Sequence, residues 1–259
     1  EVPMSDGGEG LLDVLGGPNR TALVTGPLGR SVEAAWRLHR GTAVIEMARA
    51  SGLVLAGGAE GNDPMNASTR GTGELIDHAL AQGARSVLIG LGGSATTDGG
   101  LGAIEALRSP ARIRSTDVRV ACDVRTRFVD AAAVFAPQKG ASPAQVAMLT
   151  ARLEGLAVRY REEYGVDVTE LEGGGAAGGL AGGLAALGAT LGSGFEIVAD
   201  EVDLYDRIED TDVVVTGEGY LDAQSLDGKV VGGVRYLATE HGARVVVIAG
   251  DADDDIRAE

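Results

Sequence analysis

The sequence is poor in the side chains that build disulfides, zinc centres and base-stacking surfaces. It has one cysteine, Cys122, three histidines and only 3% aromatic residues among 259. One cysteine excludes an intrachain disulfide and a four-cysteine zinc site. The histidines, at positions 39, 78 and 241, are too scattered for a histidine-rich metal centre. The chain also has few aromatic rings on which nucleic acid bases could stack.

Basic residues are also in short supply. Against 38 acidic residues there are 22 lysines and arginines, which gives a formal net charge of −16. Such a charge repels nucleic acid and anionic membranes. The sequence shows no apolar run near the roughly 20 residues of a membrane span, and no basic-then-apolar leader. We therefore expect a cytoplasmic protein with no nucleic acid and no membrane partner.

Glycine, in contrast, is abundant. The 41 glycines cluster between apolar runs, as in α/β proteins whose strand-to-helix turns approach ligands closely. One unit has an apolar run at 86–91, a loop at 92–100 and a helical pattern from Leu101. A second has a strand at 212–216, a polar loop and a helix at 231–240. Continuous Val/Ile runs that alternate with helices predict an α/β fold with a parallel sheet.

Four further segments complete the outline. Helical patterns are predicted at 73–82 and 142–160, where Ser142 is placed to cap the second helix. A short strand is predicted at 119–124. The low-complexity tract 173–194 is rich in glycine, alanine and leucine, which favours close helix packing over an exposed linker.

The loop 92–100, GGSATTDGG, is the main phosphate-binding candidate. A glycine loop between a buried strand and a helix start offers free amides to an anion. Asp98 repels phosphate, so it would serve as a magnesium ligand, as a proton acceptor for a substrate hydroxyl, or simply as the helix cap. The candidate binding residues of this loop are Gly92, Gly93, Ser94, Thr96, Thr97 and Asp98.

Two other acidic glycine loops repeat this chemistry at probable strand ends. The first offers Asp6, Gly7, Gly8 and Glu9, and the second offers Gly217, Glu218, Asp222, Gln224 and Ser225. Strand carboxyl ends in an open α/β sheet converge on a ligand crevice, although each loop also fits a solvated turn.

Several single residues have two readings each. Asp123, at a strand end, is either a metal or hydroxyl ligand or a strand terminator, and Lys139 either neutralises phosphate or lies on the surface. Glu46, amid apolar residues, is either paired or functional. The glycines of 173–178 match a dinucleotide fingerprint, but they follow no apolar strand. Lys229 lacks a following hydroxyl, so the ordinary mononucleotide-binding phosphate loop is absent.

Taken in order, a series of segments resembles the type I glycerate kinase family over nearly the whole chain. The series is VPMSDGGEG, VTGPLG, TAVIEMARASGL, GTGELI, IGLGGSATTDGGLGA, ACDV, FAPQKGA, GGAAGGLAGGL and VVTGEGYLDAQSLDGKVVGGV. The resemblance implies two α/β domains, the second inserted into the first. Residues 1–19 and 205–259 would form a discontinuous Rossmann-like domain, and residues 20–204 a mixed α/β domain that carries GGSATTDGG.

The resemblance also implies an activity and a site. It implies ATP-dependent phosphorylation of D-glycerate, with 2-phosphoglycerate favoured, in a cleft between the domains of a monomer or homodimer. Asp6, Asp98 and Lys139 would be catalytic, and Asp98 and Glu218 would bind Mg²⁺. The other residues of the three loops would bind glycerate or ATP.

The chain departs from the family pattern at four places. A PDSFKGS-like first strand and a final strand and helix are expected but not seen, and 107–120 and the passage around 128–131 are short. Two alternatives stay open: a nicotinamide-dependent oxidoreductase, and a non-catalytic sugar-acid or nucleotide-binding protein.

Overall fold

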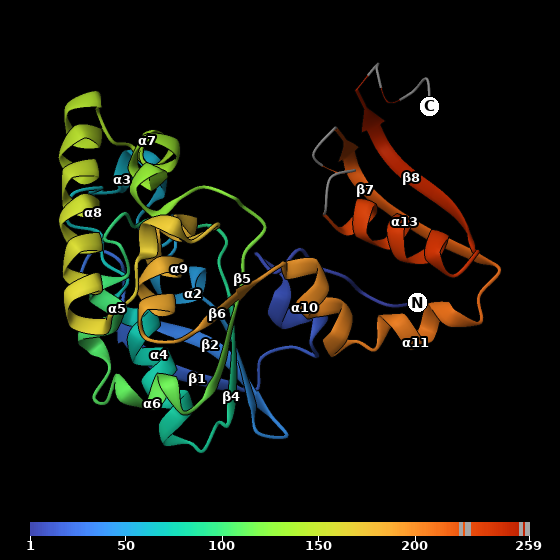
Figure 1. Ribbon diagram of the computed structural model, residues 1–259, viewed down its shortest axis with the longest axis horizontal. Coiled ribbons are helices and arrows are strands. Elements are labelled where there is room, and N and C mark those ends of the chain that lie inside the picture. Colours follow the sequence, from blue (N-terminus) through green and yellow to red (C-terminus); the bar gives the residue numbers. More distant parts are fainter. Residues whose placement is uncertain (223–224, 226–228, 254–255, 257–259) are drawn as a thin grey trace.

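The computed structural model describes residues 1–222, 225, 229–253 and 256, which form two sheets (Figure 1). The larger sheet has six strands in the order β1-β2-β3-β4-β5-β6, and the smaller pairs β7 with β8. The strands are β1 (Arg20–Thr25), β2 (Ser31–His39), β3 (Thr42–Glu46), β4 (Ser86–Gly90), β5 (Asp117–Ala121), β6 (Thr190–Gly192), β7 (Val213–Leu221) and β8 (Arg244–Ala252).

Strands β3 to β6 are parallel, whereas β1 and β2 join the sheet antiparallel. This mixed sheet with its helices confirms the α/β fold class. Because the four parallel strands run the same way, their carboxyl ends share one edge of the sheet. Ligands of open α/β sheets bind along that edge.

Helices cover the larger sheet and join it to the smaller one. They are α1 (Leu11–Val14), α2 (Ala48–Ser51), α3 (Gly58–Gly61), α4 (Arg70–Ala81), α5 (Leu101–Ala106), α6 (Ala111–Arg114), α7 (Ala131–Phe135), α8 (Pro143–Tyr164), α9 (Ala176–Ala186), α10 (Gly194–Glu201), α11 (Leu204–Glu209) and α13 (Val230–Glu240). The predicted cap of α8 is confirmed: Ser142 and Gln145 form a reciprocal capping box. None of the helices in the described part of the chain is long and apolar enough to cross a membrane.

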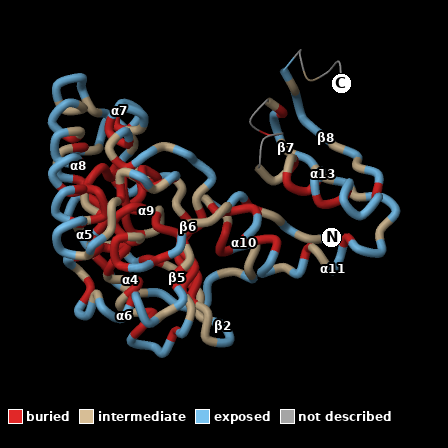
Figure 2. Tube along the Cα trace, viewed as in Figure 1, coloured by how far each residue is buried: buried red, intermediate tan, exposed pale blue. Residues whose placement is uncertain are grey.

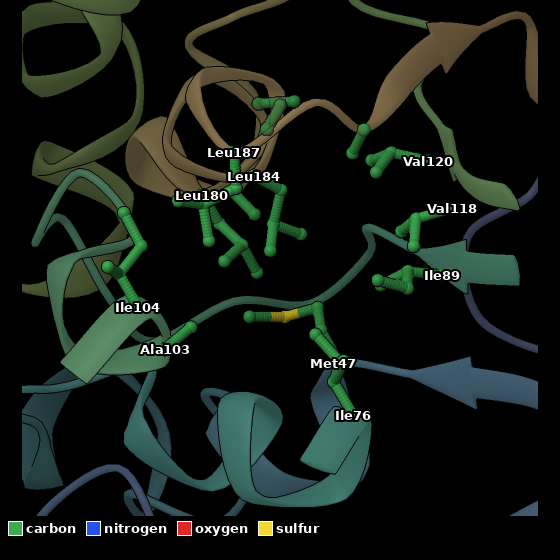
Figure 3. Close-up of a cluster of buried hydrophobic side chains, with 14 of the residues drawn as sticks. Met47, Ile76, Ile89, Ala103, Ile104, Val118, Val120, Leu180, Leu184 and Leu187 are labelled. Carbon is green, nitrogen blue, oxygen red and sulfur yellow. The ribbon is translucent and has the colours of Figure 1, made fainter. Parts of the chain in front are cut away.

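The main core lies between the sheet and the glycine-rich helix α9. Figure 3 shows Ile89 and Val120 of the sheet facing Leu184 across this core. Burying one such aliphatic side chain stabilises the fold by about 1.5–3 kcal/mol. Figure 2 shows the buried residues gathered around α9 and the larger sheet. The tract 173–194 therefore contains a packed helix, as its composition predicted, and a short strand, β6, which was not predicted.

The smaller sheet corrects one prediction. The predicted strand ended at residue 216 and a polar loop was expected after it, but β7 continues to Leu221. Gly217 allows this, because a Cβ there would lie 2.1 Å from the carbonyl oxygen of Ile248 on β8. In the sequence this glycine suggested a loop, but in the structure it permits the two strands to approach closely.

Helices α10 and α11 lie between the two sheets (Figure 1). Phe195 of α10 packs in the cluster of the smaller sheet, whereas Ile197 and Val198 pack with Leu11 and Leu12 near the larger one. Asp203, between α10 and α11, has a left-handed backbone with φ 54°. The domain boundaries at 19/20 and 204/205 stay a prediction.

Candidate active site

Two of the three predicted loops touch at the carboxyl edge of the larger sheet. A Cβ added to Gly90 would lie 2.5 Å from the carbonyl oxygen of Gly7, and one added to Gly92 would lie 3.1 Å from Cα of Gly8. The first loop also reaches β5, because a Cβ on Gly7 would lie 2.5 Å from that of Ala121. Such contacts exclude side chains, so these glycines are needed for loop 5–10 to rest on the ends of β4 and β5.

Asp123 lies beside this junction, just after β5. Its Oδ1 accepts hydrogen bonds from the amide of Gly194, at 2.8 Å, and from the hydroxyl of Ser193, at 3.4 Å. Burial raises the pKa of Asp123, and the nearby charge of Asp6 raises it further, while the Gly194 amide and Lys229 lower it. The charges of Asp6 and of Lys229, from the smaller unit, therefore both act on the carboxyl of Asp123.

Asp98 lies behind the loop and is largely buried. Its Oδ2 accepts from the amide and hydroxyl of Thr69, both at 2.8 Å, and from the amide of Gly102 at 3.2 Å. Its Oδ1 accepts from the amide of Gly100 at 3.1 Å. Four donors on one carboxylate tie α4 to the start of α5. These contacts match the capping interpretation of this residue.

Lys139 is buried next to the same loop, with 3% of its surface exposed. Its Nζ donates to the carbonyl of Thr96 at 2.6 Å. Burial lowers the pKa of Lys139 from 10.5 to about 8, although Asp98 opposes the shift. The hydroxyls of Thr96 and Thr97 are also buried, and neither has a hydrogen-bond partner among the described residues.

A cavity of about 340 Å³ opens between the loop and Lys139. Gly93, Ser94, Gln138 and Lys139 supply its polar lining. The rest of the lining is apolar and comes from Leu53, Leu91, Val124, Phe135, Ala176 and Ala177. A mostly apolar pocket of this size with a few polar groups is typical of small-molecule sites.

Comparison with known proteins decides the family. The model of the glycerate kinase family matches residues 1–111 and 108–259. The chain belongs to that family. It is 41% identical to glycerate 2-kinase of Escherichia coli K12 over 293 residues, covering 98% of this chain and 77% of that protein. It is 38% identical to glycerate kinase of Bacillus subtilis 168, covering all of this chain and 77% of that protein.

A solved structure agrees with this assignment. A crystal structure assigned to glycerate kinase 2 from Salmonella typhimurium LT2 matches with a TM-score of 0.85 and 38% identity, covering 96% of this chain and 77% of that one. The two segments matched by the family model meet at residues 108–111. That junction lies inside the stretch 107–120, which we expected to be short for a glycerate kinase.

The third predicted loop of this glycerate kinase family member lies in the smaller unit. Gly217 and Glu218 are in β7, and the amide of Ser225 donates to Asp222 Oδ1 at 2.8 Å. In the described part of the chain, β7 pairs with β8, and no hydrogen bond joins Gly217 or Glu218 to either of the other two loops. Oε1 of Glu218 is buried and lacks a hydrogen-bond partner there. Gln224 lies outside the described residues.

Two other sequence features prove to be structural. The carboxylate of Glu46 pairs with Arg49 at 2.7 Å and accepts the amide of Leu12 at 3.0 Å, so this buried acid is paired. The glycines of 173–178 follow a 3-10 turn at Val168–Glu170 and no strand. A Cβ on Gly178 would lie 2.0 Å from the carbonyl oxygen of Thr96, so this glycine is needed for packing.

Proposed function

We propose that this chain is an ATP-dependent kinase that phosphorylates D-glycerate and that 2-phosphoglycerate is its product. The family assignment supports the substrate class, since relatives over the whole chain are named glycerate kinases. The observation that carries the chemistry is the junction of loop 5–10 with Gly90–Gly92, where the charge of Asp6 acts on Asp123. The proposed site is the crevice between this junction and the smaller unit.

We propose Asp123 as the group that accepts the proton of the glycerate hydroxyl. Gly194 and Ser193 fix its position through Oδ1, and Oδ2 accepts no hydrogen bond from the described residues. Its raised pKa favours proton acceptance over that of an ordinary aspartate. In the transfer, the hydroxyl oxygen forms a bond to the γ-phosphorus as the bond to the bridging oxygen of ADP breaks. The hydroxyl proton moves to Asp123.

The nucleotide fits the cavity beside the loop better than glycerate does. Glycerate is a small, wholly polar acid, whereas the 340 Å³ cavity is mostly apolar and suits a purine nucleoside. Gly93 and Ser94 line this cavity, and their amides would bind phosphate oxygens. Lys139 also lines this cavity and would add positive charge beside the phosphates.

Magnesium fits the side chain of Asp6. Within the described residues there is no group of three or more side chains that could hold a metal by themselves. Kinase magnesium, however, needs only one or two carboxylates in addition to substrate phosphates. Asp6 is exposed, and among the described residues only its Oδ1 accepts a hydrogen bond, from the amide of Gly8 at 3.1 Å. When bound, the ion would supply neutralisation of the phosphate charge.

The remaining predicted roles are adjusted accordingly. We propose that Asp98 positions the loop and takes no part in proton transfer, because its four hydrogen bonds leave it little free acceptor capacity. Glu218 has a buried, unpartnered oxygen among the described residues, which keeps it a candidate ligand from the smaller unit. Closure of that unit over the crevice would exclude water from the reaction.

The decisive experiment measures ADP release with D-glycerate and then identifies the product. Enolase acts on 2-phosphoglycerate, so coupling to enolase without a phosphoglycerate mutase should give full signal. Signal only after mutase is added would show the 3-phosphate and refute that part of the proposal. Ligand-dependent thermal shifts without ADP release would favour the non-catalytic alternative. A saturable NADH fluorescence change would favour the oxidoreductase.

A further inference from the structure

A second cavity, of about 400 Å³, lies away from the proposed active site. Its floor is apolar and comes from Val14, Leu15, Val44 and Val202. Its polar lining consists of Arg37, His39, Arg40, Thr42 and Glu201. Thr42 begins β3, whereas the proposed active site lies at the carboxyl end of the parallel strands. The cavity therefore belongs to the opposite edge of the sheet.

The lining of this cavity is basic, although the chain as a whole carries −16. Arg37 Nη1 donates to the carbonyls of Gly16 and Gly17, at 2.9 and 2.8 Å. Its other guanidinium nitrogens have no hydrogen-bond partner among the described residues. The one acidic group of the lining, Glu201, is engaged in an ion pair with Arg119 of β5. The negative charge of Glu201 is thus largely neutralised by Arg119, which does not line the cavity.

Arg40 is held at the cavity by its backbone. It forms the turn between β2 and β3 with a left-handed φ of 50°, which is uncommon for a residue with a side chain. Its side chain is exposed, and no ion pair with it is found in the described part of the chain. Two arginines and a histidine around one cavity suit the planar, multidentate contacts that arginine makes with phosphate.

The cavity also lies at the connection between the two units. Glu201 ends α10, and Val202 precedes Asp203, the left-handed residue that leads into α11. The other end of α10, about 12 Å away for eight residues, donates the Gly194 amide to Asp123. Helix α1 likewise runs from the acidic glycine loop to the cavity through Val14. A ligand here would contact the last turn of the helix whose first turn holds Asp123.

We propose that this cavity binds a small phosphate-bearing ligand at the junction of α10 and α11, as a second site distinct from the one proposed for catalysis. The phosphate is held by Arg37, Arg40 and His39, and an attached apolar segment rests on the valine floor. Bound ligand restrains the connection between the two units. Binding at this site is independent of the proposed kinase activity.

The test uses the intact chain and inorganic phosphate, with sodium chloride at matched ionic strength. Backbone hydrogen exchange is followed at residues 38–42 and 201–203, where phosphate should increase protection. Binding is titrated in the same samples. The double variant Arg40→Gln/His39→Gln should bind phosphate at this site at least about tenfold more weakly, since each charged hydrogen bond contributes roughly 1.4 kcal/mol or more.

The matched control is Arg235→Gln, which removes an exposed arginine from α13 outside the cavity. It should bind phosphate as the wild type does. Thermal unfolding without phosphate checks that both variants are folded. Phosphate protection confined to the loops around Gly92 and Asp6 would overturn the proposal. So would an unchanged affinity at 38–42 in the double variant.

Discussion

Replacing Asp98 by asparagine separates a structural role from a chemical one. The amide oxygen can take the position of Oδ2 and keep the donors of Thr69 and Gly102. Its NH₂ group then faces the amide of Gly100, a donor that previously bonded to Oδ1. The Gly100 amide and the new NH₂ group are then two buried donors without an acceptor, and three charge-assisted bonds become neutral.

The loss is sizeable for a single substitution. An unpaired buried donor costs about 1–3 kcal/mol, and neutral hydrogen bonds are roughly half as strong as charge-assisted ones. We expect Asp98→Asn to lower the free energy of unfolding by about 3 kcal/mol, and therefore the Tm by roughly 6–12 °C. Turnover of the folded variant, measured well below its Tm, should fall by less than about tenfold.

Asp123→Asn is the matched comparison. Its two hydrogen-bond partners in the described part of the chain, Gly194 and Ser193, both bond to one oxygen, which an amide oxygen can replace. Its Tm should stay within a few degrees of the wild type, while turnover should drop by about 10²–10⁴ if it accepts the proton. Calorimetry and an ADP-release assay on the same preparations give both quantities. An Asp98→Asn variant with unchanged Tm and turnover reduced more than a hundredfold would refute the reasoning.

Three further outcomes are expected. Burial lowers the pKa of Lys139 in the folded protein from 10.5 to about 8, so its buried charge destabilises the fold below pH 8. As the pH rises from 8 towards 10.5, the folded protein loses this charge and the wild type becomes more stable. The stability advantage of Lys139→Met over the wild type, measured by urea unfolding, should therefore shrink across that interval. Gly194→Ala would place a Cβ 1.8 Å from the carbonyl oxygen of Asp6, and should lower the free energy of unfolding by at least about 1–3 kcal/mol and reduce turnover. A Cβ on Gly219 would have nothing within 4 Å, so Gly219→Ala should leave turnover intact. Equal effects of the two substitutions on turnover and Tm would contradict the packing argument. Removing divalent cations with EDTA should abolish ADP release and Mg²⁺ should restore it, and turnover that persists in EDTA would refute the assignment of Asp6 as a magnesium ligand.

Local patterns predicted the regular elements best where apolar periodicity and caps agreed. The run at 86–91, the helix from Leu101 and the start of α8 at Ser142 were all found close to their predicted positions. The predicted length of β7 was too short, because Thr216–Leu221 contains two glycines and resembles a loop. Only the partner strand β8, which Gly217 approaches closely, reveals the extended conformation.

Side-chain roles were harder to predict, because they depend on residues distant in the sequence. Asp98 and Asp123 both follow strands, yet one is saturated by Thr69 and its own helix start, while the other faces Asp6. For Lys139 the sequence left open a phosphate-neutralising role or a surface position, and the structure shows it buried, with its Nζ bonded to the Thr96 carbonyl. The contact between the first two loops followed from the sheet rule, whereas the place of Gly217 and Glu218 inside β7 did not.

The bend at the start of α9 ties the glycine loop to a distant part of the chain. Ala177, Gly178 and Gly179 are all left-handed, and Cβ atoms on Gly178 and Gly183 would lie 2.0 and 2.5 Å from the carbonyl oxygens of Thr96 and Gly99. The loop is thus shaped against a bare helix surface encoded some eighty residues later. Anyone transplanting GGSATTDGG into another scaffold should carry α9 with it, or expect a different backbone shape from the same nine letters.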